Sequence, residues 1–241
     1  MKRFALMLFA VLLITGTALA SPDIRYAAGR DVTLLTISPP WPGGHGALSR
    51  NEVVEVLGAG TERGTVRIHF FAPTGQAIPA QVAENRLSPQ RAGDPPRIAI
   101  VNNPDPADRL HMRLAPRSDS LSRGRYYNGT VLTVLQLRRD GWAQVDLRGY
   151  KGWMKAEFLQ LGQLPGSVTP MHPVAAVKSA SAQGSMLKEL PNTGSNFGRY
   201  PDHTAVFILG VTGGWAHVYA PDGLTGFMPL KELDVPGGLR P

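Results

Sequence analysis

The stretch Gly149-Tyr150-Lys151-Gly152-Trp153-Met154 recurs about 74 positions later as Gly223-Leu224-Thr225-Gly226-Phe227-Met228. A second shared pair precedes each copy, Gly141-Trp142 in the first case and Gly214-Trp215 in the second. Repetition over this distance indicates that one small structural unit has been duplicated. A duplicated small unit favours binding over catalysis, although it does not identify the ligand.

Glycine and proline divide the rest of the chain into short segments. The 241 residues include 27 glycines and 21 prolines, which fall between short apolar runs, as is typical of an all-β protein. Pro-rich stretches at 88–96 and 163–173 are predicted to be linkers. They divide the chain into units at 21–90, 98–161 and 174–234, which we expect to be tandem barrels arranged as beads, each with its own core.

The middle unit has the clearest strand pattern. We expect strands at 110–113, 131–135, 142–147 and 152–154, with a polar loop running through Ser122. The glycines before Trp142 and Trp153 are expected to free the backbone at turns.

The first unit is predicted to be a third, degenerate copy. It lacks both aromatic landmarks of the middle unit: Thr65 stands where Trp142 would be, and Ala77 lies near the Trp153 position.

The middle unit resembles the bacterial SH3-type domain. Four landmarks of that family occur in order: Leu110-His111-Met112-Arg113-Leu114-Ala115-Pro116, Gly129-Thr130-Val131-Leu132-Thr133-Val134, Gly141-Trp142-Ala143-Gln144-Val145 and Gly152-Trp153-Met154. The resemblance covers residues 98–161 and implies a small, strongly bent antiparallel barrel. It also implies an exported protein, because family members often hold cell-wall hydrolases to peptidoglycan or its peptide bridges, while others mediate protein contacts.

The first 20 residues are predicted to be a helical, cleaved signal peptide. A basic start is followed by an apolar run, and Ala18-Leu19-Ala20 supplies the small residues of a cleavage site. No later segment is apolar for the roughly 20 residues that a membrane span needs. No cysteine follows the cleavage site, so we expect a periplasmic or secreted protein that is not a lipoprotein.

The formal net charge is +7, and much of the excess lies in the middle unit. Residues 98–161 carry ten Lys and Arg side chains against six Asp and Glu, a net of +4. A basic face attracts anionic polymers, lipid headgroups or nucleic acid, or simply keeps a protein soluble. We expect no nucleic-acid partner, because the chain is predicted to be exported.

The sequence carries no recognisable enzyme signature. It has no His-Glu-x-x-His zinc motif, no Gly-x-Ser-x-Gly elbow and no cysteine nucleophile. None of its six histidines shares a metal-ligand spacing with another. We therefore expect no catalytic residues, no metal and no cofactor, and the chain is predicted not to be an enzyme.

Aromatic side chains are the candidate ligand-binding residues, because tyrosine and tryptophan offer flat apolar faces with a polar handle. The candidates are Tyr126, Tyr127, Trp142, Trp153, Tyr200 and Trp215. The alternative is structural: the tryptophans, together with Phe227, plug their barrels. Trp41, in a Pro/Gly-rich stretch, is either an exposed contact residue or folds back on the first unit.

The expected function is non-catalytic binding at the bacterial cell envelope, with peptidoglycan or its peptides as the ligand. The alternative is an envelope adaptor or structural protein that contacts a protein partner. The sequence leaves the ligand, the oligomeric state and the packing between units open.

Overall fold

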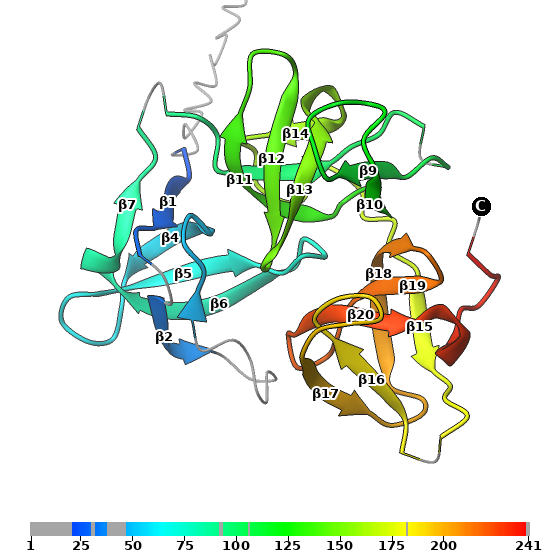
Figure 1. The fold of residues 1–241 in the computed structure, drawn as a ribbon. Helices are drawn as coiled ribbons and strands as arrows, with labels where there is room; N and C mark the ends of the chain where they lie inside the picture. Colours follow the sequence, from blue (N-terminus) through cyan, green and yellow to red (C-terminus); the bar gives the residue numbers. More distant parts are fainter. Residues whose placement is uncertain are drawn as a thin grey trace, which may run out of the picture.

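The computed structural model describes residues 21–29, 32–37, 47–91, 94–105, 107–181 and 183–239. The predicted signal peptide (1–20) and Trp41 lie outside these ranges. The described chain is built almost entirely of antiparallel strands, which form three lobes in sequence order (Figure 1). This confirms the predicted all-β fold class of tandem SH3-like barrels.

Barrel 1 spans residues 23–89 and contains seven strands and one 3₁₀ helix. These are β1 (Asp23–Ala27), β2 (Val32–Ile37), β3 (Ala47–Leu48), β4 (Val53–Ala59), β5 (Thr65–Phe71), β6 (Ala77–Ala83), η1 (Glu84–Arg86) and β7 (Leu87–Pro89). The strand order across the sheet is β3-β2-β6-β5-β4-β1-β7.

Barrel 2 spans residues 98–161 and repeats this order as β10-β9-β13-β12-β11-β8-β14. Its elements are β8 (Ile98–Val101), β9 (Leu110–Arg113), β10 (Ser122–Tyr126), β11 (Val131–Leu137), β12 (Trp142–Leu147), β13 (Tyr150–Lys155), η2 (Ala156–Phe158) and β14 (Leu159–Leu161). The four predicted strands are present, and a further strand, β10, begins at Ser122, where the predicted polar loop was expected to end. Its sequence Ser-Arg-Gly-Arg-Tyr has no apolar alternation, and pairing with neighbouring strands stabilises it instead.

Barrel 3 spans residues 174–234 and has the same order once more, β17-β16-β20-β19-β18-β15-β21. Its elements are β15 (Val174–Val177), β16 (Ser185–Lys188), β17 (Asn196–Tyr200), β18 (Ala205–Thr212), β19 (Trp215–Tyr219), β20 (Thr225–Pro229), η3 (Leu230–Glu232) and β21 (Leu233–Asp234). The degenerate first unit is therefore a third copy by topology.

The strand register corrects one detail of the repeat. Trp142 and Thr65 do occupy the same position, but the residue equivalent to Trp153 is Gln81 and not Ala77. Trp153 pairs with Gln144, and Gln81 pairs with the equivalent residue Arg67. The sequence of barrel 1 has no aromatic landmark that would fix this register.

The two glycines of the repeated stretch serve different purposes. Gly149 and Gly223 adopt φ angles of 99° and 86°, which favour glycine at a turn. Gly152 and Gly226 have no such φ angle. A side chain at Gly152 would overlap Met112, and one at Gly226 would lie 2.8 Å from Leu187 Cγ. The prediction that Gly152 frees a turn is therefore wrong, since it allows two strands to approach closely.

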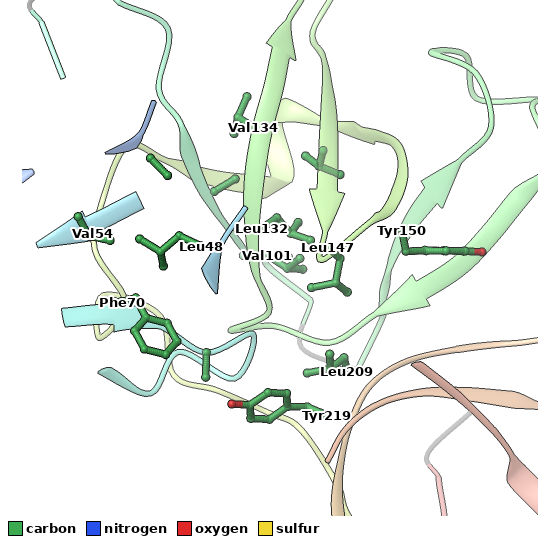
Figure 2. Close-up of a cluster of buried hydrophobic side chains, with 14 of the residues drawn as sticks. Leu48, Val54, Phe70, Val101, Leu132, Val134, Leu147, Tyr150, Leu209 and Tyr219 are labelled. Carbon is green, nitrogen blue, oxygen red and sulfur yellow. The ribbon is translucent and has the colours of Figure 1, made fainter. Parts of the chain in front are cut away.

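Barrels 1 and 2 are not beads with separate cores, whereas barrel 3 also has a buried core cluster of its own. One buried apolar cluster joins Leu48 and Phe70 of barrel 1 to Leu132 of barrel 2 and to Leu209 and Tyr219 of barrel 3 (Figure 2). Each barrel is too small to bury all of its apolar surface alone, and the barrels cover one another instead.

Specific polar contacts hold barrel 1 against barrel 2. The Arg148 guanidinium lies 3.1 Å from a carboxylate oxygen of Glu52, and both side chains are about nine-tenths buried. The amide of Val131 donates a hydrogen bond to the carbonyl of Pro73.

The second predicted linker is packed rather than free. Val168 is buried between barrels 1 and 2, and the Met171 amide donates to the Asn128 carbonyl. The His172 Nε2 atom lies 3.0 Å from Thr130 Oγ1, and burial lowers the pKa of His172 to about 4.

Candidate functional site

Three of the six predicted ligand-binding residues are buried tyrosines. Tyr126 is fully buried, with its hydroxyl 3.0 Å from His217 Nδ1 in barrel 3. Tyr127 is buried under Arg109, whose Nη1 donates to its hydroxyl, and the Tyr200 hydroxyl donates to Asp222. The structure buries all three rings, so they are not exposed for the ligand contact that the sequence predicted.

Tyr126 belongs to an aromatic cluster between barrels 2 and 3. His217 stacks on Phe227 at a ring distance of 4.3 Å, and Tyr150 of barrel 2 packs edge-on against both rings. Burial lowers the pKa of His217 to about 3 and raises that of Tyr126 well above its ordinary value. Phe227, expected to plug its own barrel, is buried in this shared cluster.

The three tryptophans retain some exposed surface. Trp142 is 7% exposed, while Trp153 and Trp215 are half-buried. The Arg138 guanidinium lies 5.7 Å from the Trp153 ring centre, and the Lys188 ammonium lies 5.8 Å from that of Trp215. These residues remain candidates for ligand contact.

Trp142 borders a pocket of about 170 Å³ on barrel 2. Because Leu110 and Met112 of β9 point into the core, the alternate residues His111 and Arg113 face outward. Lys155 lies directly opposite Trp142 in the β12–β13 pair. The residues that line the pocket are Asn103, Asp108, Arg109, Leu110, His111, Arg113, Ser118, Trp142, Lys155 and Phe158.

The loop at the pocket rim is fixed by amide hydrogen bonds. The Asn103 amide donates to Asn128 Oδ1, and Asn128 Nδ2 donates to the Asn103 carbonyl. Asn103 Nδ2 in turn donates to the Asp108 carbonyl. This network holds the loop that leads to Arg109, so the pocket is largely formed in advance of any ligand.

The pocket is electropositive. Among the lining residues, Arg109, Arg113 and Lys155 outnumber the single carboxylate, Asp108, and the Lys155 ammonium lies 3.1 Å from a carboxylate oxygen of the adjacent Glu157. Burial, together with the neighbouring positive charges of Arg113 and Arg125, lowers the pKa of His111, which is therefore neutral at neutral pH. An anionic group attached to an apolar or flat moiety fits this combination of cations with Trp142.

Sequence reasoning did not single out the cationic side of this pocket. Arg113 belongs to the first motif of the resemblance, and Lys155 follows the repeated Gly-Trp-Met. Their alternation with buried neighbours was the available signal, but only the strand pairing shows that they converge beside Trp142.

Metal and membrane sites are not found in the part of the chain that the structure describes. Within those ranges, no group of three His, Asp or Glu side chains is placed to hold a metal ion. No described helix has the length and apolar character that crossing a bilayer requires.

Comparison with known proteins identifies the module that carries the pocket. Residues 108–160 match the family model described as bacterial SH3 domain. No curated protein matches this chain.

Solved structures similar to this chain include two NlpC proteins. NlpC1 from Trichomonas vaginalis is 14% identical at a TM-score of 0.28, over 60% of this chain; the match spans only 47% of NlpC1. An NlpC/P60 family protein from Bacillus cereus ATCC 10987 is 9% identical at a TM-score of 0.27, over 88% of this chain and 98% of its own. These scores are too low to support an inference about activity.

Proposed function

Because residues 108–160 form a bacterial SH3 domain, we propose that this chain is a non-catalytic, exported binding protein of the bacterial cell envelope. The predicted signal peptide at 1–20 supports export. The 241 residues contain no cysteine, so they offer neither a lipidation site nor a cysteine nucleophile.

The proposed ligand is peptidoglycan, held through the anionic groups of its peptides. The observation that carries this proposal is the pocket in which Arg113 and Lys155 lie beside Trp142. Peptidoglycan stem peptides carry free carboxylates on short aliphatic side chains. The two cations pair with a carboxylate, and the small part of Trp142 that is accessible, 7% of its surface, contacts the apolar part.

Tight packing of the three barrels limits how the ligand is bound. A flexible string of modules gains avidity by reaching several sites independently. Here one buried cluster contains residues of all three barrels, so we propose that the pocket on barrel 2 presents a single fixed site.

Charge reversal on one strand tests the proposal. Lys155→Glu removes a cation from the pocket, whereas the matched Lys151→Glu makes the same charge change on the same strand outside the pocket. Sedimentation with purified peptidoglycan is expected to recover wild type and Lys151→Glu equally, and Lys155→Glu at least about tenfold less. Equal recovery of both variants would contradict the pocket assignment.

A protein partner in place of the wall polymer gives a different result. In that case purified peptidoglycan recovers no wild-type protein, while cross-linking in cells yields one partner in stoichiometric amount. Clearing of wall material by the pure protein in a zymogram would contradict the non-catalytic part of the proposal.

A further inference from the structure

The joint between barrels 2 and 3 is a strand pairing across two repeats. The edge strand β10 pairs with the end of β18, with Arg125 opposite Val211 and Tyr126 opposite Gly210. The Tyr126 ring lies flat on Gly210, where a Cβ atom would lie 2.7 Å from Tyr126 Cδ1. Glycine at this position is therefore a requirement of the joint.

Barrel 3 carries an unused copy of the donating strand. β17 has the place in barrel 3 that β10 has in barrel 2, and Gly198-Arg199-Tyr200 repeats Gly124-Arg125-Tyr126. Among the described residues, β17 pairs with β16 alone, so its other edge carries no strand. Phe197 on this strand is 45% exposed.

Barrel 1 carries an unused copy of the accepting strand. Leu57-Gly58-Ala59 at the end of β4 corresponds to Leu209-Gly210-Val211, and the same β-bulge precedes each glycine. β1 pairs with β4 only as far as Val56, which leaves an open groove along these residues. Leu57 is 41% exposed, whereas the equivalent Leu209 is fully buried by the joint.

Barrel 2 provides the internal contrast. Its equivalent of Gly58 and Gly210 is Gln136, which follows the bulge in β11. The corresponding donor strand of barrel 1, β3, has two residues and pairs with β2 but not with β11 among the described residues. Glycine thus occupies the accepting position in barrel 3, which receives a strand, and in barrel 1. Barrel 2, whose contact with barrel 1 is of another kind, has no glycine at this position.

We propose that β17 of one molecule pairs with β4 of a second copy of this chain, reproducing the internal joint head to tail. The repeat equivalence places Arg199 opposite Ala59 and Tyr200 opposite Gly58. The pairing covers Phe197 and Leu57. The Arg67 side chain now lies over Gly58 and donates to the Ala59 carbonyl; it is exposed and can move aside when a strand pairs there.

The partner that fits these two strand edges is a second copy of this chain. Both halves of the joint are present on one chain, and both match the sequence of the joint already formed. Because the two surfaces differ, the contact is heterologous and generates a ring or an open chain of molecules. The interface is small, so the association is weak and concentration-dependent.

Engineered cysteines test the register directly, since the native chain has none. Ala59→Cys and Arg199→Cys proteins, prepared separately and mixed under mild oxidation, are expected to form a disulfide-linked pair in several-fold excess over a control. The control mixes Ala59→Cys with Val174→Cys, a similarly exposed position on β15. Equal yields in the two mixtures would overturn the proposal.

Self-association of the cysteine-free protein provides a second measurement. Phe197→Lys adds a charge to the proposed edge, whereas Phe207→Lys makes the same change at an aromatic residue that is 42% exposed on β18. Sedimentation velocity is expected to show about tenfold weaker association for Phe197→Lys and no change for Phe207→Lys. A monomeric wild type at about millimolar concentration, or equal effects of both changes, would contradict the pairing. Neither result depends on peptidoglycan binding.

Discussion

His217 makes the joint between barrels 2 and 3 sensitive to acid. Its side chain is buried, and its Nδ1 atom lies 3.0 Å from the Tyr126 hydroxyl. We therefore expect the folded protein to resist protonation at this residue.

The size of the effect follows from the pKa difference. Burial lowers the pKa of His217 from its ordinary 6.5 to about 3 in the folded protein. Below pH 6.5 the unfolded chain binds a proton at this histidine, whereas the folded protein does not. His217 therefore leaves the free energy of unfolding unchanged above about pH 6.5 and lowers it progressively as the pH falls to about 3. At pH 5 the loss from this one group is about 2 kcal/mol.

Urea unfolding at pH 7 and pH 5, followed by tryptophan fluorescence, measures this difference. In His217→Gln the drop in free energy of unfolding between the two pH values is expected to shrink by about 2 kcal/mol. The control His203→Asn changes an exposed histidine with a φ of 67°, a conformation that asparagine tolerates, and should leave the drop unchanged. A drop in His217→Gln as large as that of wild type would refute the reasoning.

Two further substitutions probe the same joint. Gly210→Ala places a methyl group against the Tyr126 ring and is expected to lower the free energy of unfolding, measured in urea, by about 2 kcal/mol. Gly198→Ala is its control, because a Cβ atom at that position meets its first neighbour at 3.6 Å. Phe227→Ala removes a fully buried ring and is expected to lower the free energy of unfolding by about 4 kcal/mol. The control Phe207→Ala changes a partly exposed ring and is expected to lower it by less than about 0.5 kcal/mol. Similar melting temperatures for the two variants would contradict the burial assignment.

Part of the candidate site could be predicted from the sequence. The Gly-Trp pairs located Trp142 and Trp153 on neighbouring strands, and the register places Trp142 opposite Lys155 and Trp153 opposite Gln144. The cations Arg113 and Lys155 could not be added, because their convergence depends on which strands lie side by side.

The tyrosine predictions failed for a related reason. Tyr126 and Tyr200 occupy equivalent positions, but barrel 3 covers the first, and a hydrogen bond to Asp222 holds the second. Both rings are buried by residues that lie far from them in the chain, and no local pattern records those contacts.

The sequence alone determined the all-β character and the repeat, because turn glycines and alternating apolar residues act over a few neighbouring positions. It also determined that cysteine chemistry is impossible in these residues. Only the tertiary structure decided which aromatic residues are exposed and that one buried cluster contains residues of all three barrels. Burial depends on contacts between residues such as Phe70, Leu132 and Tyr219, which lie far apart in the chain and meet only when the three barrels assemble (Figure 2).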